Sequence, residues 1–182
     1  MVALTAVAIG LLTLFPPRTG RGSVTGKQTV NARMIADLNG LSREINQEFG
    51  SYGSIPLVNC GPCGRFAKIF RDCWKERFGQ QLKFVFVMTF DKRDCLHILV
   101  RLPDGNYFDG GLGVMSRELL DAEFFDAPLV EQENYDLLEL NERAYGLIRP
   151  YPNCPKFDAV KARQLVHRAL TNMRDPIPAR AN

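Results

Sequence analysis

The chain has no run of lysine and arginine and no strong excess of either charge. Its 182 residues carry 23 Lys and Arg against 20 Asp and Glu, a net charge of +3, and both signs are scattered along the sequence. Surfaces that bind nucleic acid concentrate basic residues into a patch or stripe. The sequence therefore predicts no nucleic-acid partner.

A hydrophobic segment long enough to span a membrane is also missing. Residues 2–15 are apolar but stop at Pro16, whereas a spanning helix needs roughly 20 such residues. The segment lacks the basic start and the clear cleavage site of a signal peptide. A weak membrane anchor, a degenerate signal and an unstructured extension stay open for this segment, and we expect a cytoplasmic protein. We treat residues 1–30 as an apolar segment followed by a flexible linker rich in Gly, Pro, Ser and Thr.

Cysteine is too sparse and too unevenly spaced for a secreted disulfide framework. The chain has five cysteines, an odd number, so at least one is unpaired within the chain. Free thiols in a reducing compartment fit this pattern, and we predict no cofactor and no metal. The cysteines are Cys60, Cys63, Cys73, Cys95 and Cys154.

The rest of the chain predicts one α+β domain over residues 31–175, followed by a loose tail at 176–182. Apolar periodicity predicts helices, and runs of β-branched and aromatic residues predict strands, of which the one at 82–90 is expected to be covered on both faces. Cys73 and Trp74 are expected in the core, and His167 in solvent. Helices are expected at 32–49, 63–78 and 157–173, partly helical stretches at 115–126 and 131–145, and strands at 82–90, 96–102 and from 107.

Cys63 has the position of an activated nucleophile. It follows Gly61 and Pro62 at the start of a predicted helix, where unpaired backbone N–H groups and the helix dipole favour a thiolate. The same N–H groups can bind the oxyanion of a tetrahedral intermediate. The sequence therefore predicts a thiol nucleophile with an oxyanion site built from backbone.

A base and an orienting carboxylate follow on the predicted strands. His97 is one of only two histidines, and Asp109 comes just after the "PDGN" turn. A tight turn centred on Asp104–Gly105 pairs residues whose numbers add up to about 209, which places His97 near Leu112 and Asp109 about three residues away. A bulge or a looser register is then needed to bring His97 and Asp109 together.

Two stretches resemble a known family. "GPCGRFA" followed by a strand, and then "HILVRLPDGNYFDGG", are similar to the transglutaminase-like branch of the papain-like cysteine protease superfamily, over residues 59–111. "YFDGGLG" is also similar to the aspartate segment of arylamine N-acetyltransferases, which belong to that superfamily. The resemblance implies a nucleophile helix packed on an antiparallel sheet, with Cys63 as nucleophile, His97 as general base and Asp109 as orienter.

The activity that this resemblance implies is that of a cysteine hydrolase or acyltransferase. It would act on an amide or thioester through an acyl-enzyme, and a peptidase or amidase is the preferred form. Its partner would be a peptide, a protein or another amide or thioester substrate, held in a groove built from residues 115–155. An inactive binding domain that keeps the fold is a further alternative.

Other chemistry of the cysteine pair stays open. "NCGP" resembles bacteriocin-processing peptidases, in which the first cysteine attacks, but no Gln for the oxyanion lies between Gln47 and Cys60. "CGPC" is also the redox motif of thioredoxin-type enzymes, although no apolar strand precedes it. A zinc site made of Cys60, Cys63, Cys95 and His97 is the remaining alternative.

Overall fold

The computed structural model describes residues 30–133 and 155–173, and it confirms a mixed α+β fold with antiparallel sheets. The predictions for the N-terminal segment, residues 134–145, Cys154 and the tail lie outside these residues. The helices are α1 (Ala32–Phe49), η1 (Leu57–Asn59, a 3-10 turn), α2 (Cys63–Phe78), α3 (Arg117–Glu123) and α5 (Ala159–Asn172). The strands are β1 (Ser51–Tyr52), β2 (Ile55–Pro56), β3 (Lys83–Met88), β4 (Cys95–Arg101), β5 (Tyr107–Asp109), β6 (Gly113–Met115) and β7 (Leu129–Gln132).

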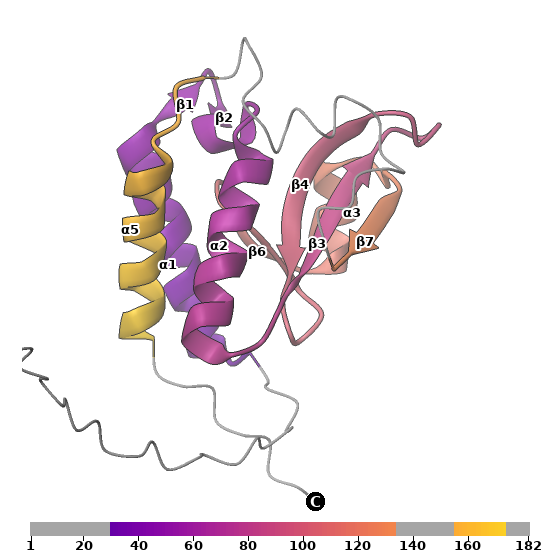
Figure 1. The fold of residues 1–182 in the computed structure, drawn as a ribbon. Coiled ribbons are helices and arrows are strands. Elements are labelled where there is room, and N and C mark those ends of the chain that lie inside the picture. The colour runs from indigo at the N-terminus through magenta and orange to yellow at the C-terminus, as the bar shows by residue number, and fades with distance from the viewer. Residues whose placement is uncertain (1–29, 134–154, 174–182) are drawn as a thin grey trace, which may run out of the picture.

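The main sheet separates two layers of helix. Its five antiparallel strands run in the order β6-β5-β4-β3-β7, and β1 and β2 form a separate small hairpin. Helices α1, α2 and α5 stand side by side on one face, and α3 lies on the opposite face (Figure 1). Both faces of the sheet are therefore covered, as the sequence predicts for the strand at 82–90.

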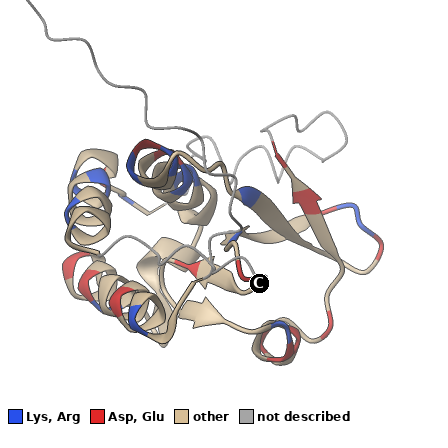
Figure 2. Cartoon of the chain, turned by 90° about the horizontal axis from the view of Figure 1, so that it is seen from below, with Lys and Arg blue, Asp and Glu red and all other residues tan. Residues whose placement is uncertain are grey.

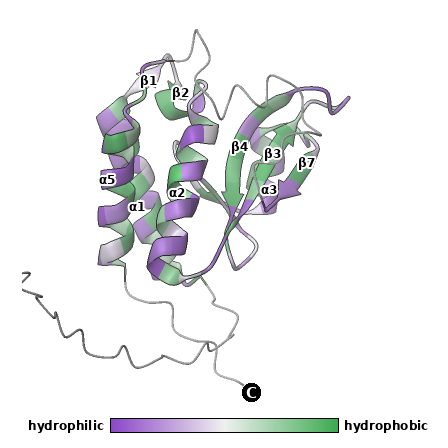
Figure 3. Ribbon diagram, in the orientation of Figure 1, coloured by the Kyte–Doolittle hydropathy of each residue, from purple (hydrophilic) through white to green (hydrophobic). Residues whose placement is uncertain are grey.

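The central strand β3 contributes to both cores. Phe84 and Phe86 pack into the cluster formed with α1, α2 and α5, whereas Val85 and Val87 pack into the smaller cluster with Leu120 of α3. Successive side chains of a strand point to opposite faces, so a strand buried on both faces has no polar side. This explains the uninterrupted apolar run Phe84–Met88 in β3 (Figure 3).

Local signals set the ends of the helices. The Asn31 side chain accepts a hydrogen bond from the Met34 N–H (2.9 Å) at the start of α1, and Gly50 ends that helix with φ of +78°. Gly79 ends α2 in the left-handed conformation (φ +72°). Asp158 caps α5 in the same way as Asn31 caps α1. The predicted helices 32–49, 63–78 and 157–173 are thereby confirmed to within two residues.

The core contains the predicted side chains. Cys73 and Trp74 of α2 are buried, and His167 of α5 is exposed. Burial raises the pKa of the Cys73 thiol to about 11. Cys73 is therefore a small apolar core residue at neutral pH and not a reactive thiol.

Of the two stretches predicted to be partly helical, 115–126 is confirmed and 131–145 is wrong at its start. Residues 131–132 belong to strand β7, because Val130 and its neighbours complete the sheet by pairing with Phe86 on β3. The stretch 115–126 contains the helix Arg117–Glu123, and its first residue, Met115, pairs with Tyr107 as part of β6. Pairing with a distant strand decides both cases, and local periodicity does not report it.

The surface carries charges of both signs. Figure 2 shows basic and acidic residues mixed on the outward faces of the helices, in agreement with the scattered charge of the sequence. Over residues 30–133 and 155–173, no helix has the length and apolar character required to cross a membrane.

Candidate active site

Cys63 is the first residue of α2, as the sequence predicts. The chain enters the helix through Gly61, whose φ of +118° favours glycine, and Pro62, which occupies the N-cap position. No side chain caps this helix start, and the first turn carries no acidic residue. The positive end of the helix dipole is thus left to act on the Cys63 sulfur. Cys63 itself is only 3% exposed.

The register between β4 and β5 differs from the predicted one by a single residue. Val100 pairs with Phe108 and Arg101 with Tyr107, so paired numbers add up to 208 and not 209. The cause is a turn of three residues between Leu102 and Asn106, in place of the predicted two-residue turn. A shift by one residue exchanges the faces of every side chain in a strand.

This register brings His97 and Asp109 together. Asp109 falls opposite Leu99, so its side chain lies on the same face as that of His97, two residues along β4. His97 Nε2 hydrogen-bonds Asp109 Oδ2, and both residues are buried. No bulge is required to bring the two side chains together, because the longer turn between β4 and β5 supplies the register.

Three further donors hold the other oxygen of the carboxylate. Asp109 Oδ1 accepts from Asn59 Nδ2 (2.9 Å), from the Gly111 N–H (2.8 Å) and from the Leu112 N–H (2.7 Å). Both oxygens of this buried acid are therefore satisfied, one by the imidazole and one by a fixed cradle. Such a cradle fixes the orientation of the carboxylate and hence of the ring.

The charges of the three residues are coupled. Burial by itself lowers the pKa of His97, but the Cys63 and Asp109 charges and their hydrogen bonds outweigh it, so the His97 pKa lies well above its usual value. Burial raises the pKa of Asp109, and the His97 charge together with hydrogen bonds from His97, Asn59 and Leu112 reverses this, so that the pKa is lowered overall. Because Nε2 faces Asp109, Nδ1 is the ring nitrogen left for Cys63.

Cys60 has a different environment. It is half-buried, its thiol points to the Pro56 carbonyl oxygen (3.6 Å), and burial and the charge of Cys63 raise its pKa. The thiol that interacts with His97 is that of Cys63. Of the two cysteines, the structure thus places Cys63 with the predicted base and acid.

Two residues of the site were missed by the sequence analysis. Asn59, the last residue of η1, supplies a hydrogen bond to Asp109, and Phe124, just after α3, stacks on the His97 ring with centroids 5.3 Å apart. Asn59 lies just before Cys60 but 50 residues from the carboxylate that it binds, and Phe124 reaches the ring from the end of α3. An Asn or a Phe in a loop carries no local signal of such a role.

The glycines after Asp109 allow the chain to pass close to its neighbours. A Cβ at Gly110 would lie 2.5 Å from the Phe66 ring, and one at Gly111 would lie 2.6 Å from Pro56 Cβ and 2.8 Å from Asn59 Nδ2. Real Cβ contacts are not so short, so any larger residue would displace these groups. The "DGG" sequence is therefore required by packing beside the catalytic candidates.

Replacing Gly111 by alanine is expected to destabilise the fold by about 1–3 kcal/mol, because the added methyl group overlaps Pro56 and Asn59. Urea unfolding measures this change. Gly40→Ala in α1 is the matched control: its Cβ would meet only Arg43 Nη2 at 3.8 Å, and the fold should gain about 0.5–1 kcal/mol. Equal effects of the two substitutions would contradict the close approach.

The zinc alternative is not supported by the arrangement of the cysteines. Within the described parts of the chain, no three or more His, Cys, Asp and Glu side chains are grouped so as to hold a metal ion. The Cys95 thiol instead donates to the carbonyl oxygen of His97 (3.2 Å). The cysteine pair is also preceded by η1 and not by the strand that a thioredoxin-type motif requires.

A cavity of about 350 Å³ opens beside His97. Asn59 and His97 form part of its wall, and Leu112 and Phe124 form another part. Cys63 is not among the lining residues. The cavity therefore gives access to the imidazole side of the site.

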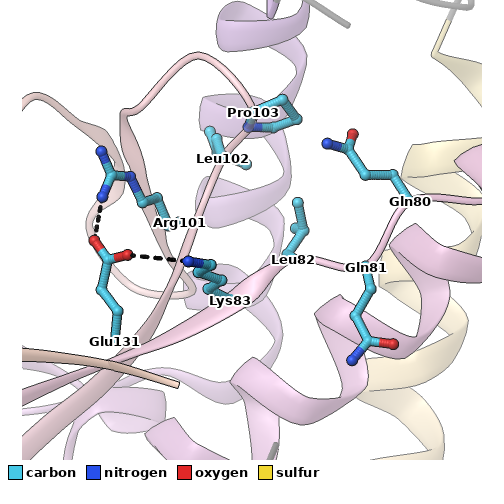
Figure 4. A pocket seen from close by; sticks show the side chains of 8 residues that line it. All are labelled: Gln80, Gln81, Leu82, Lys83, Arg101, Leu102, Pro103 and Glu131. Atoms are coloured by element: carbon cyan, nitrogen blue, oxygen red, sulfur yellow. Dashed lines mark hydrogen bonds and ion pairs between the residues drawn. The ribbon is translucent and has the colours of Figure 1, made fainter. Parts of the chain in front are cut away.

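A second cavity, of about 210 Å³, lies elsewhere on the sheet, between β3, β4 and β7. Figure 4 shows Glu131 at one end, paired with both Lys83 and Arg101, while Gln80 lies near Pro103 at the other end. The Lys83 Nζ to Glu131 Oε2 distance is 4.0 Å. Because Glu131 already engages both cations, we assign no ligand to this cavity.

The three side chains predicted from the sequence, Cys63, His97 and Asp109, thus lie together, supported by Asn59 and Phe124. Comparison of the chain with family models, with curated proteins and with solved structures found no match, so the chemistry of this site is what indicates a function.

Proposed function

We propose that the protein is a cysteine-dependent hydrolase or acyltransferase that acts on an amide or thioester, with a peptidase or amidase as the preferred form. Cys63 is the nucleophile, His97 the general base and acid, and Asp109 the orienting carboxylate. The core is of the transglutaminase-like or papain-like type, in which a helix that starts at the nucleophile packs on an antiparallel sheet. The contact of α2 with β4 supports this assignment.

The observation that carries the proposal is the buried His97–Asp109 pair next to Cys63. A buried imidazole whose Nε2 is held by a carboxylate presents Nδ1 in one orientation and is stabilised as imidazolium. A thiol beside it can transfer its proton and become a thiolate. The carboxylate is itself held by Asn59 and two backbone N–H groups.

The reaction proceeds in two halves. The Cys63 thiolate attacks the carbonyl carbon, and the oxyanion that forms is bound by the backbone N–H of Cys63 at the helix start. The C–N or C–S bond then breaks, and the leaving amine or thiol takes its proton from the His97 imidazolium. In the second half, His97 removes a proton from water or an amine, which attacks the acyl-enzyme and releases Cys63.

Thiol labelling tests the nucleophile directly. Iodoacetamide should alkylate Cys63 faster than Cys60, Cys73 and Cys95 at pH 7, because among the described cysteines Cys63 is the one that has the imidazole as a partner for its proton. Mass spectrometry of tryptic peptides after short exposures gives the rate at each site. The His97→Gln variant should lose this preference.

The comparison with Cys60 separates activation from simple access. Cys60 is the more exposed of the pair, and its pKa is raised, so labelling governed by access alone would modify Cys60 first. Buried Cys73, with a pKa of about 11, sets the unreactive baseline. Cys63 labelled no faster than Cys73 would overturn the proposal, and a reversible Cys60–Cys63 disulfide at roughly −200 to −270 mV would favour a redox function instead.

A further inference from the structure

The cavity beside His97 has a chemical character that indicates what fills it. We infer that it binds a long, partly apolar side chain that ends in a cation, that is, a lysine or arginine residue of a peptide substrate. This inference rests on the proposed function, since it places that residue next to the reacting carbonyl. It concerns the substrate, whereas the proposed function concerns the reaction.

Apolar groups line much of the cavity. Ile55 and Pro56 of β2 lie in its wall together with Leu112 and Phe124, and the Phe124 ring is fixed by stacking on His97. Ile55 and Leu112 are 52% and 39% exposed, so large apolar side chains stay in contact with solvent here. The volume of about 350 Å³ is at the low end of small-molecule sites, roughly 300–1,000 Å³, and suits one long side chain.

The charge at the cavity is negative. Among the described lining residues, Glu123 is the only one with a fixed charge, and no ion pair joins it to another described residue. The other titratable group, His97, is already paired with Asp109. Residues 117–126, which include the lining residues Glu123 and Phe124, contain four acidic residues and one basic residue. An unpaired carboxylate at the rim of an apolar cavity attracts the cationic end of a side chain whose stem lies on apolar surface.

The polar atoms in the wall of this cavity also favour a ligand that carries a hydrogen-bond donor. Asn59 uses its Nδ2 to bind Asp109, while its Oδ1 is buried and has no hydrogen-bond partner. A buried acceptor without a partner costs free energy until a donor reaches it. Asn59 Oδ1 is closed off in the free protein, so a backbone N–H of the substrate would reach it after a local displacement of the cavity wall, while the cation of the same residue meets Glu123.

The test uses two small probes that differ only in the ammonium group. Nα-acetyl-lysine methylamide and Nα-acetyl-norleucine methylamide are titrated into the ¹⁵N-labelled full chain, and amide shifts give the site and the affinity. We expect shifts at Leu112 and Phe124, and about threefold tighter binding of the lysine probe at low salt, the range of a solvent-accessible ion pair. High salt should remove the difference.

Variants of α3 decide whether Glu123 is responsible. Glu123→Gln should abolish the preference for the lysine probe, whereas Glu118→Gln, an exposed acid on the same helix that does not line the cavity, should keep it. Equal affinity of both probes for the wild-type chain, or shifts confined to another surface, would overturn the inference. The same titration with Cys63→Ser separates the two proposals, because binding of the probes in the cavity needs no thiol. Failed labelling of Cys63 would contradict the proposed function and would leave the binding result intact.

Discussion

The Cys63→Ser variant is expected to lose about 10⁴-fold or more of its acyl-transfer rate while keeping its fold. Serine has nearly the same shape, but its hydroxyl does not ionise beside His97 as a thiol does, so the attacking group is lost. Removal of a nucleophile from such a triad leaves only the contribution of binding and the oxyanion site. Turnover of a peptide thioester or of p-nitrophenyl acetate measures the loss, and circular dichroism checks the fold.

Cys60→Ser is the matched control for this result. Cys60 lies three residues earlier and its thiol points to the Pro56 carbonyl oxygen, whereas Cys63 is the cysteine whose charge and hydrogen bond act on His97. Its replacement should change the rate by less than about threefold, the scale of a small local perturbation. The opposite pattern, in which Cys60→Ser is inactive and Cys63→Ser is active, would identify Cys60 as the nucleophile and favour the bacteriocin-processing alternative.

The Asp109→Asn variant is expected to lower the acyl-transfer rate by about 10³-fold. An amide in this position cannot balance the imidazolium charge, and it can hold the wrong tautomer of His97. The cradle of Asn59, Gly111 and Leu112 donates to a carboxylate oxygen, so the amide oxygen can still accept from it. The pH–rate profile should shift together with the rate, because the Asp109 charge is one reason for the high pKa of His97.

The same substitution should change stability in a pH-dependent manner. The pKa of Asp109 is lower in the folded protein than its usual value of 3.8, so the unfolded chain takes up its proton first as pH falls. The stabilisation is thus present above about pH 4 and is lost as pH falls through the folded-state value. We expect wild type to exceed Asp109→Asn by about 3 kcal/mol at pH 7, and this difference to shrink below pH 4.

Urea unfolding of both proteins between pH 2.5 and 7 tests this expectation. All other titrating groups are common to the two chains, so the difference between them isolates Asp109 and its partner. His167→Gln, at the exposed second histidine, is a control substitution outside the site and should alter neither the rate nor the stability. A difference that is constant across the whole pH range would show that the carboxylate is not held as an ion in the folded state.

Much of the fold could be predicted because its signals are local. Asn31 and Gly50 mark the two ends of α1, and Gly79 ends α2, through the conformations and hydrogen bonds that these residues favour. The apolar run of β3 reports burial on both faces. Strand β7 could not be predicted in this way, because its pairing with β3 is a contact between segments more than 40 residues apart.

The sequence by itself determined which residue types the site can use and their order along the chain. Cys63 at a helix start, His97 on a strand and Asp109 after a turn are local features, since each depends on its immediate neighbours for its conformation.

Only the tertiary structure decided how these features combine. The three-residue turn sets the register that puts His97 and Asp109 on one face, and close packing at Gly110 and Gly111 brings Asn59 to the carboxylate. It also settled which of two neighbouring thiols meets the imidazole. Such choices depend on distances of a few ångströms between segments far apart in the chain, and these are fixed by packing of the whole fold and not by any short stretch of sequence.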